Sequence, residues 1–469
     1  MGVAAIAALT LPACFVNDAA VICPAWSTAG VGGTCERRAW SLPGAEDGLG
    51  DPWAQHVMAA VDGRGRGIVG YAWSEGLEVL EEGDPGSWSV RRAGEVMGGS
   101  IPSDLVAGVD GSAAFAWSVV SGSEQTLYLS ERDAAGGWRE PSSEADALSF
   151  PDHAYQPRLA TNRAGEWIVA WNQWRSEPHF GVCVGTRERS AAPWIMPADR
   201  DDVLSLPIFF SNAPLIALND SGQAIITWYQ SLGGPLRAFV SERSGPGDPF
   251  SRVTEDDTLS PAEGAVDSDP IAAVKPAIAA DGSAAVAWAG ENNAGSVLVY
   301  LATRDAAGTW QRPRDVDDVF SIPQGYARGV QIAFGPRGDL YVVWYQDAGG
   351  GDTVYAARRR PDGAWAEGGR APMRLSTPGA QGYLPKIAVG PEGSVVVVWS
   401  EHEGEGPMRI AARRTGATSE PWGPIEVLSP ETGEDAVHPS VAMGPGDRAI
   451  AAWAQGPGAA QRVMIARVE

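Results

Sequence analysis

The sequence predicts an all-β protein, an eight-bladed β-propeller built from four-stranded antiparallel blades. Three observations lead to this fold class. One short apolar phrase recurs eight times, the residues around each copy alternate with the period of a β-strand, and helical periodicity is absent. The chain of 469 residues holds 58 Gly and 35 Pro, which supply turns, and its hydrophobic content of 44% argues against a disordered chain.

The recurring phrase consists of a Gly-containing turn, about four apolar β-formers and a Trp, which we assign to the second strand of each blade. The copies recur at a mean spacing of about 54 residues, within the range of repeat arrays. Their final residues are Trp73, Trp117, Trp171, Trp228, Trp288, Trp344, Trp399 and Trp453.

Other strands surround each copy in a fixed order. An apolar first strand and a tight turn precede it, as in PKIAVGPEG at 385–393, and an alternating third strand follows, as in TVYAARRR at 353–360. A Gly-rich turn and an aromatic residue then open a polar fourth strand, which ends in a Leu-Ser phrase such as Leu428-Ser429. Four short strands per repeat are typical of propeller blades.

The last copy stops after its third strand, at 461–469. A spare strand near Cys35–Trp40 is therefore expected to supply the fourth strand of the last blade and to close the ring, which removes two sheet edges. On this prediction residues 35–469 form a single propeller domain. Length alone would have suggested several domains.

The first fourteen residues are apolar, too short to span a bilayer, and typical of the end of a secretory signal. Leu11-Pro12-Ala13-Cys14 resembles the bacterial lipobox, which implies lipidation of Cys14 and location in the cell envelope or outside the cell; a buried N-terminal segment is the alternative. With Cys14 lipidated, Cys23 and Cys35 are the natural disulfide pair around a linker at 15–34, whereas Cys183 is expected in the core.

The net charge of −23 repels phosphate backbones and argues against a nucleic-acid partner. No other apolar run is long enough to cross a membrane, so we expect membrane contact only through Cys14. We expect a monomer without cofactor or metal. Acidic clusters at Asp199–Asp202, Glu255–Asp257 and Asp315–Asp318 are expected on outer strands, where charge blocks edge pairing; calcium binding is the alternative.

The phrases SERDAAGGW at 130–138 and ATRDAAGTW at 302–310 resemble relaxed Asp boxes, the turns between third and fourth strands of sialidase-like propellers. The resemblance covers nearly the whole chain and implies a propeller of the sialidase-like kind. Sialidases also need an arginine triad, with one Arg in an Arg-Ile-Pro phrase, and a Tyr–Glu pair. No Arg-Ile-Pro is present. The resemblance therefore implies a fold without the sialidase catalytic set.

In a propeller the loops from second to third strand and from blade to blade share one face, which we call the loop face. All five histidines fall there: His56, His153, His179, His402 and His438. Residues that break the repeat near first-strand starts are further candidates for ligand binding: Tyr155, Arg158, Lys275, Arg328, Tyr383, Lys386 and His438. Three interpretations stay open: polar loops that merely collect such residues, a binding site, or a His metal site.

Aromatic and amide residues in the repeat are expected to be mostly structural. Fourteen Trp positions have a place, eight in second strands and six at fourth-strand starts, which leaves Trp174 as a contact candidate. Two residues after the repeat Trp stands a Glu or Gln in six copies. We expect it to cap loop amides, with a polar rim around the channel as the alternative. The six residues are Glu75, Gln173, Gln230, Gln346, Glu401 and Gln455.

These observations predict a non-enzymatic, exported propeller that binds a protein or glycan partner on the loop face. The alternative is a propeller glycoside hydrolase or lyase at the channel mouth. A hydrolase needs two carboxylates about 5–9.5 Å apart, for which Glu75, Glu291 and Glu401 are the candidates. A scaffold without a small ligand is a third hypothesis.

Overall fold

The computed structural model describes residues 39–468 apart from 45–46, 51–53, 74–75, 85, 96–99, 123, 177–178, 208–209, 268–272, 367–371, 417–421 and 459. Before them it describes two strand pairs, β1 (Val16–Asn17) with β2 (Ala20–Val21) and β3 (Ser27–Ala29) with β4 (Cys35–Arg37). The expected lipidation site Cys14, the disulfide partner Cys23 and the side chain of Cys35 lie outside the described residues.

The first half of the chain forms antiparallel sheets in sequence order. Their strands are β6 (Gln55–Val61), β7 (Gly67–Trp73), β8 (Gly76–Glu82) and β9 (Trp88–Glu95); β10 (Ser100–Ala107), β11 (Ala113–Ser121), β12 (Glu124–Arg132) and β13 (Trp138–Arg139); β14 (Ala154–Thr161), β15 (Trp167–Ser176) and β16 (His179–Arg187); β17 (Ser211–Leu218), β18 (Ala224–Ser231) and β19 (Leu236–Arg243).

A nine-stranded sheet follows, in which one parallel bridge from Val297 to Tyr326 joins two antiparallel units. The first unit holds β20 (Ala265–Val266), β21 (Lys275–Ile278), β22 (Ala284–Glu291), β23 (Val297–Arg304) and β24 (Trp310–Gln311). The second holds β25 (Tyr326–Phe334), β26 (Leu340–Asp347), β27 (Asp352–Arg359) and β28 (Met373–Arg374).

Two four-stranded sheets complete the chain. One holds β29 (Gln381–Val389), β30 (Val395–His402), β31 (Arg409–Thr415) and β32 (Glu426–Val427), and the other holds β33 (Ala436–Gly444), β34 (Arg448–Gln455), β35 (Arg462–Val468) and β5 (Trp40–Ser41). In the last sheet Trp40 pairs with Val468, so a strand from the N-terminal part lies beside the C-terminal strand.

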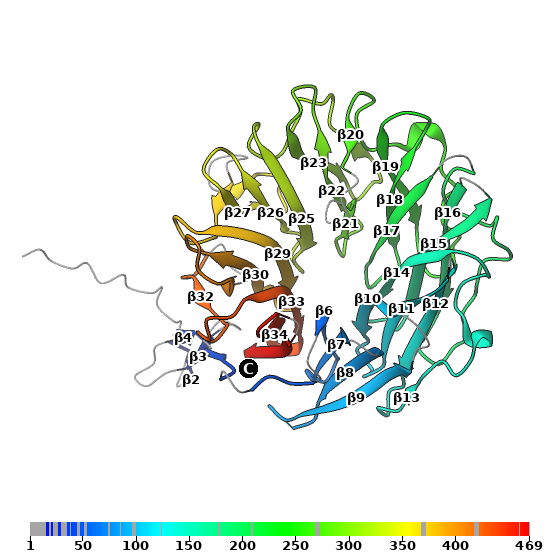
Figure 1. Ribbon diagram of the computed structural model, residues 1–469. Helices are drawn as coiled ribbons and strands as arrows, with labels where there is room; N and C mark the ends of the chain where they lie inside the picture. Colours follow the sequence, from blue (N-terminus) through cyan, green and yellow to red (C-terminus); the bar gives the residue numbers. More distant parts are fainter. Residues whose placement is uncertain are drawn as a thin grey trace, which may run out of the picture.

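The described residues thus form an all-β fold with sheets arranged around a central axis, as in a β-propeller (Figure 1). One strand of each unit lies innermost (Figure 1), and we call these the inner strands: β6, β10, β14, β17, β21, β25, β29 and β33. Each contacts the next one along the chain, and β33 contacts β6. Within the described part of the chain no helix is long and apolar enough to span a membrane.

The core lies between neighbouring sheets. The residues that lead up to the second-strand aromatic are mostly apolar, as in the run from Val395 to Val398, because both faces of these strands are buried. The first and last sheets also share a core, in which Val69 and Tyr71 pack with Ala452 and Val463. The tight turns need left-handed backbone, and Gly282 (φ +86°), after Asp281, supplies it without a side-chain penalty.

One second-strand aromatic differs from the sequence prediction. In the first sheet the structural equivalent of the repeat Trp is Tyr71, which is fully buried, whereas Trp73 is only partly buried and carries the Arg92 guanidinium 5.4 Å from its ring centroid. The register confirms the shift, because Met58 of the inner strand pairs with Gly70, the residue before Tyr71. The other seven repeat tryptophans are 3% exposed or less.

Two further expectations fail locally. The fourth strand of the β14 and β17 sheets shrinks to the isolated bridges Thr186–Ile195 and Phe239–Thr258. The acidic clusters form turns and short 3₁₀ segments rather than outer strands, because their carboxylates accept backbone N–H groups within the cluster. Asp257 in η2 (Glu255–Asp257) accepts the Thr254 N–H at 2.7 Å. Two further 3₁₀ segments that the structure describes in full are η1 (Glu144–Asp146) and η5 (Pro445–Asp447).

Arginines near the ends of third strands connect neighbouring sheets. Arg132 bonds Glu81 at 2.5 Å, Arg187 bonds Glu131 at 2.5 Å, and Arg467 bonds Glu82 of the first sheet. These guanidiniums are largely buried and also reach backbone carbonyls, as Arg132 does at Gly111. Much of the arginine content therefore has a structural role.

Candidate functional site

A β-bulge interrupts most inner strands near their start. At five bulges a non-glycine residue adopts left-handed backbone, with φ between 50° and 56°: His56, Gln156, Ala213, Leu384 and His438. Four of these residues precede a proline, which disfavours helical backbone before it and has no N–H to lose from the ladder. Gly329 (φ +59°) occupies the same place in β25. Such bulges turn the following side chain away from its regular direction.

The residue that follows the bulge, or that opens β21, occupies one structural level around the channel. In every inner strand it pairs with the residue immediately before the second-strand aromatic. We call these eight residues the channel positions: Met58, Asp104, Arg158, Leu215, Lys275, Gln331, Lys386 and Ser440. The set contains both lysines of the chain and one arginine, so the charge here breaks the symmetry of the fold.

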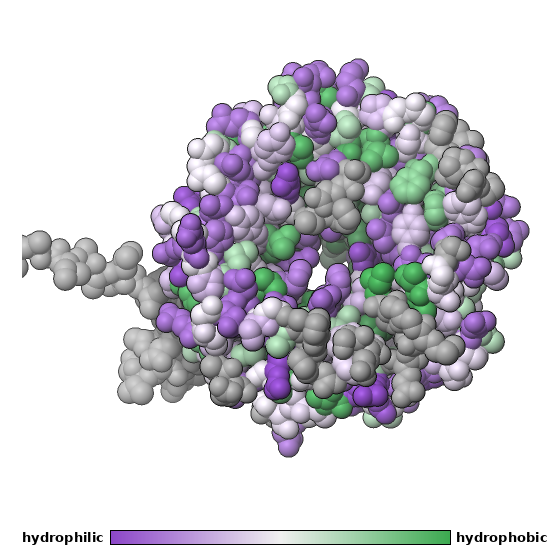
Figure 2. All heavy atoms as spheres, in the orientation of Figure 1, coloured by the Kyte–Doolittle hydropathy of each residue, from purple (hydrophilic) through white to green (hydrophobic). Residues whose placement is uncertain are grey.

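The three basic channel residues and Asp104 interact electrostatically with one another although they come from four different inner strands. The charges of Lys386, Arg158 and Asp104 act on the Lys275 ammonium of β21. The charges of Arg158 and Asp104 act on the Lys386 ammonium of β29. Strands on different sides of the ring can bring charges together only toward the axis, so these side chains face the channel. Figure 2 shows that the centre of the ring is open and bordered in part by hydrophilic residues.

These cations have no carboxylate partner in an ion pair among the described residues. Arg158 donates through a guanidinium N–H to the Ser103 carbonyl, and neither lysine ammonium makes a hydrogen bond within the described part of the chain. Asp104 is bonded instead to backbone, accepting the Leu105 N–H at 3.0 Å and the Leu159 N–H at 2.8 Å. The cluster therefore carries an excess of positive charge inside a protein of net charge −23.

The surroundings shift the pKa values of Asp104, Lys275 and Lys386 so that each group favours its uncharged form more than it does in water. Burial, then the positive charges of Lys386 and Arg158, lower the pKa of Lys275 to about 7, against an opposing effect of Asp104. Burial and Arg158 also lower the pKa of Lys386, although solvent reaches its side chain through the channel. Burial raises the pKa of Asp104 despite Arg158. Burial is the largest cause of each of these pKa shifts.

Two pairs of predicted residues come together near the channel. The rings of His56 and His438, on β6 and β33, stack with centroids 6.3 Å apart, and both are exposed. Burial, His56 and Lys386 lower the pKa of His438. Tyr383 stacks on His402 at 5.8 Å, with its hydroxyl 3.5 Å from His402 Nε2.

Other predicted residues are not members of the basic cluster. Arg328 is exposed on β25, with its guanidinium 5.6 Å from the Tyr326 ring centroid. Trp174 and Tyr155 belong to an aromatic cluster between β14 and β17 that also includes His153. Among the described residues no group of three or more His, Cys, Asp or Glu side chains is placed to hold a metal ion.

The Gln or Glu after the repeat Trp has the structural role that we expected. Gln346 accepts the Trp344 indole N–H at 3.0 Å and donates to the carbonyls of Ile322 and Gln324 in the incoming loop. The same bond from indole to Gln or Glu recurs at Gln173, Gln230, Glu401 and Gln455.

The two described glutamates named for hydrolysis, Glu291 and Glu401, lie in different surroundings. Glu401 is buried and accepts bonds from Trp399, Thr377 and Arg409. Glu291 is exposed at the end of β22, and Glu75 lies outside the described residues.

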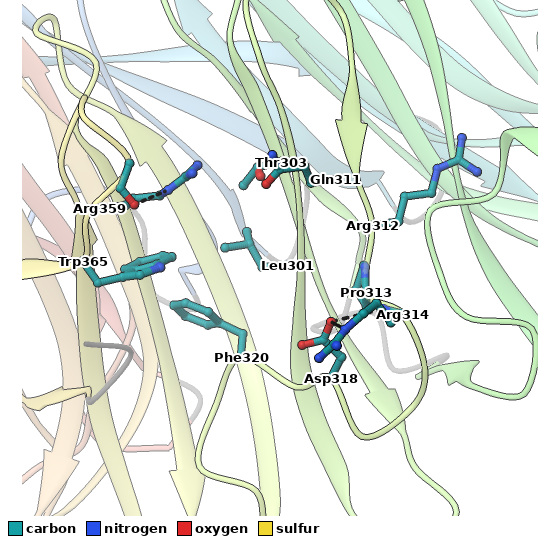
Figure 3. A pocket seen from close by; sticks show the side chains of 11 residues that line it. Leu301, Thr303, Gln311, Arg312, Pro313, Arg314, Asp318, Phe320, Arg359 and Trp365 are labelled. Carbon is teal, nitrogen blue, oxygen red and sulfur yellow. Dashed lines mark hydrogen bonds and ion pairs between the residues drawn. The ribbon is translucent and has the colours of Figure 1, made fainter.

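A second concave feature lies away from the channel, between the β23–β24 and β27 regions (Figure 3). It is a shallow, polar pocket of about 260 Å³ in which Trp365 and Phe320 face each other below Arg359. Its arginines have protein partners: Arg359 donates to the Gly363 carbonyl, Arg312 to the Asp256 carbonyl and Arg314 to Asp318.

The sequence patterns did not indicate Asp104, Gln156 or Phe180. A Pro stands near the start of β14, β17, β29 and β33, directly after the left-handed residue, and this recurring Pro could have located the bulge. The side chain two positions after the left-handed residue could then have been assigned to the channel.

No known family model and no curated protein matches the chain. Among solved structures it is similar to a protein of unknown function from Dyadobacter fermentans, with 16% identity over 68% of this chain and 95% of that chain and a TM-score of 0.40. It is also similar to the polysaccharide lyase Uly1 (10%, 76% and 87%, TM-score 0.45) and the Hadza microbial sialidase Hz136 (11%, 74% and 73%, TM-score 0.38). At these values the likeness carries no argument about activity.

Proposed function

We propose that this protein is a non-enzymatic binding protein that takes an anionic group of a protein or glycan partner into its channel mouth. Arg158, Lys275 and Lys386 are the residues that would hold the anion. Asp104 would limit the excess charge of the unoccupied site and fix the β10–β14 contact through its bond to the Leu159 N–H.

One observation carries the proposal. Three of the eight channel positions hold cations, and these cations have no ion-pair partner among the described residues. Both lysines of the chain are among them. Stability does not explain them, because bringing like charges together costs free energy unless a counter-charge compensates them. An anion from a partner would supply that compensation.

The surrounding charge sets the behaviour of such a site. The net charge of −23 repels an approaching anion at long range, so affinity must come from direct contact with the channel cations rather than from the general field. Partly buried charges, such as those of Lys275 and Arg158, are screened less by salt than fully exposed charges are. Moderate salt should therefore weaken binding less than it weakens a surface ion pair.

Titration calorimetry with inorganic sulfate and with glucuronate tests the proposal. Lys386→Met should reduce affinity at least tenfold, whereas Arg314→Met, which removes one exposed cation at the outer pocket, should not. Unchanged melting temperatures would show that both variants fold. Equal affinity of the Lys386→Met variant and the wild type would refute the proposal.

We also infer that the sheets form a closed ring of eight blades completed by β5. Supporting contacts are the Trp40–Val468 pairing, the shared core around Tyr71 and Ala452, and the bond from the Ala59 N–H to Ser440 Oγ at 3.0 Å. Deleting residues 39–44 should then lower the melting temperature, because it exposes the edge of β35. An unchanged melting temperature would count against closure by β5.

Export and anchoring at Cys14, with a Cys23–Cys35 disulfide and a monomeric state, complete the proposal. Fractionation of cells that produce the wild type or Cys14→Ala tests the anchor. The wild type should stay with the membrane and the variant should be released. Mass spectrometry after alkylation without reductant tests the disulfide.

A further inference from the structure

The aromatic cluster beside the channel is a second part of the same surface. Phe180 on β16 lies at its centre, with edge-to-face contacts to Tyr155 (5.0 Å between centroids), Trp174 (5.0 Å) and Phe210 (5.6 Å). His153 adds an edge contact to Trp174 at 5.9 Å. All five rings are partly exposed, in contrast to the repeat tryptophans of the core. We call these residues the aromatic platform.

The platform is rigid, because backbone pairing fixes its members. Trp174 pairs with Phe180 across the β15–β16 ladder, and its backbone N–H bonds the His153 carbonyl at 2.7 Å. With ten residues, β15 is the longest second strand, so its hairpin extends farther than the others. A rigid aromatic surface loses little conformational entropy when a ligand binds.

The platform adjoins the cationic channel through one strand. Tyr155 precedes the bulge residue Gln156, and Arg158 follows two positions later, a separation of roughly 10 Å along β14. Between them, Asn172 donates to Gln156 Oε1 and to Asn212 Oδ1, both at 3.1 Å. A ligand whose ring packs on the platform can therefore place an adjacent anionic group at Arg158, because the side chains between the two sites are polar.

The polar groups at the platform edge favour an oxygen-rich ligand. The Trp174 indole N–H has no hydrogen-bond partner among the described residues, unlike that of Trp171 in the same strand, which bonds Gln173. The Gln156 amide nitrogen also has none within the described part of the chain, and Arg158 adds further N–H groups. Partnerless donors beside aromatic faces suit a pyranose, whose C–H face packs on rings while its hydroxyls accept hydrogen bonds.

From this juxtaposition we infer that the partner is an acidic polysaccharide, with a pyranose ring packed on Trp174 and Phe180 and a carboxylate or sulfate in the channel. The inference rests on the proposed function and names its ligand class. An acidic peptide is the competing occupant, and its binding is one outcome of the test below. Charge complementarity with Arg158, Lys275 and Lys386 selects an acidic sugar chain over a neutral one.

The test compares a uronate-containing oligosaccharide, its carboxyl-reduced neutral form and inorganic sulfate as ligands in calorimetry. Trp174→Leu should weaken both oligosaccharides about tenfold and leave sulfate within twofold of the wild type. Lys386→Met should weaken the uronate form and sulfate. Tyr326→Leu, which removes an aromatic side chain that is 51% exposed on β25, is the matched control and should change nothing.

The outcomes separate the two proposals. If sulfate binds through Lys386 but Trp174→Leu leaves the oligosaccharide affinity unchanged, the platform inference is wrong and the proposed function stands. If sulfate binds and neither oligosaccharide does, or if an acidic peptide alone responds to Trp174→Leu, the inference is also overturned. If Lys386→Met changes no affinity, the proposed function itself fails. Saturation-transfer NMR provides a second readout, because platform contact should saturate the sugar C–H protons.

Discussion

Replacing Lys275 by arginine should abolish most of the pH dependence of anion binding. In the free protein the pKa of Lys275 is about 7, because burial and the positive charges of Lys386 and Arg158 disfavour its ammonium form. A bound anion reverses this effect and raises the pKa toward the ordinary value of 10.5. Between these two values the complex holds one proton more than the free protein does, so binding takes up a proton.

The magnitude follows from linkage. Below pH 7 Lys275 is charged in both states and affinity is constant, whereas above pH 7 the free site must first be protonated. Affinity for sulfate, which keeps its charge over this range, should fall about tenfold from pH 6 to pH 8. In Lys275→Arg the guanidinium stays charged, so this part of the slope disappears.

Calorimetry at pH 6, 7 and 8 in buffers of different ionisation enthalpy measures both the affinity and the proton uptake. Lys275→Met removes the charge, so this variant should bind sulfate weakly at every pH. Lys275→Arg keeps the charge and removes only its titration, so comparing the two variants separates these effects. A flat wild-type profile, or an equal slope in Lys275→Arg, would show that Lys275 does not titrate in the binding step.

Three further predictions concern the fold. Gln346→Leu should lower the free energy of unfolding by roughly 3–5 kcal/mol in urea titrations, because it strands the Trp344 indole N–H and two loop carbonyls; a loss below about 1 kcal/mol would contradict the capping role. Tyr71→Ala should cost about 3–5 kcal/mol and Trp73→Ala less than about 2 kcal/mol in the same assay, and the reverse order would contradict the assignment of Tyr71 to the core. Burial raises the pKa of Cys183 to about 12, so its thiol should resist alkylation at pH 8 until denaturant is added; rapid labelling of the native protein would disprove its burial.

The architecture was largely predictable because the repeat places equivalent residues at equivalent structural positions. The Trp and the Gln two residues later recur together because one bonds the other, so their spacing reported a real contact. The same logic fails in GIVGYAW, where Tyr71 and Trp73 lie on the same face of one strand and alternation cannot decide which is buried. Pairing with the inner strand decides it.

The candidate site was predictable in its residues but not in its geometry. Arg158, Lys275 and Lys386 stood out because they broke the repeat. Their convergence depends on strand register, which is known only from the partner strand. Asp104 takes its place through its pairing with Ala116 and its bond to the Leu159 N–H of the next sheet. The prediction that the acidic clusters lie on outer strands was wrong, because alternation and charge cannot distinguish an outer strand from a turn capped by its own carboxylates.

The most direct test of the central claim is to locate a bound oxyanion. Crystals soaked in selenate and measured at the selenium edge should show an anomalous peak on the channel axis, within hydrogen-bond distance of the ammonium groups of Lys275 and Lys386. The peak should be absent from crystals of Lys386→Met. A peak confined to the outer pocket at Arg312, Arg314 and Arg359, with an empty channel, would contradict the account.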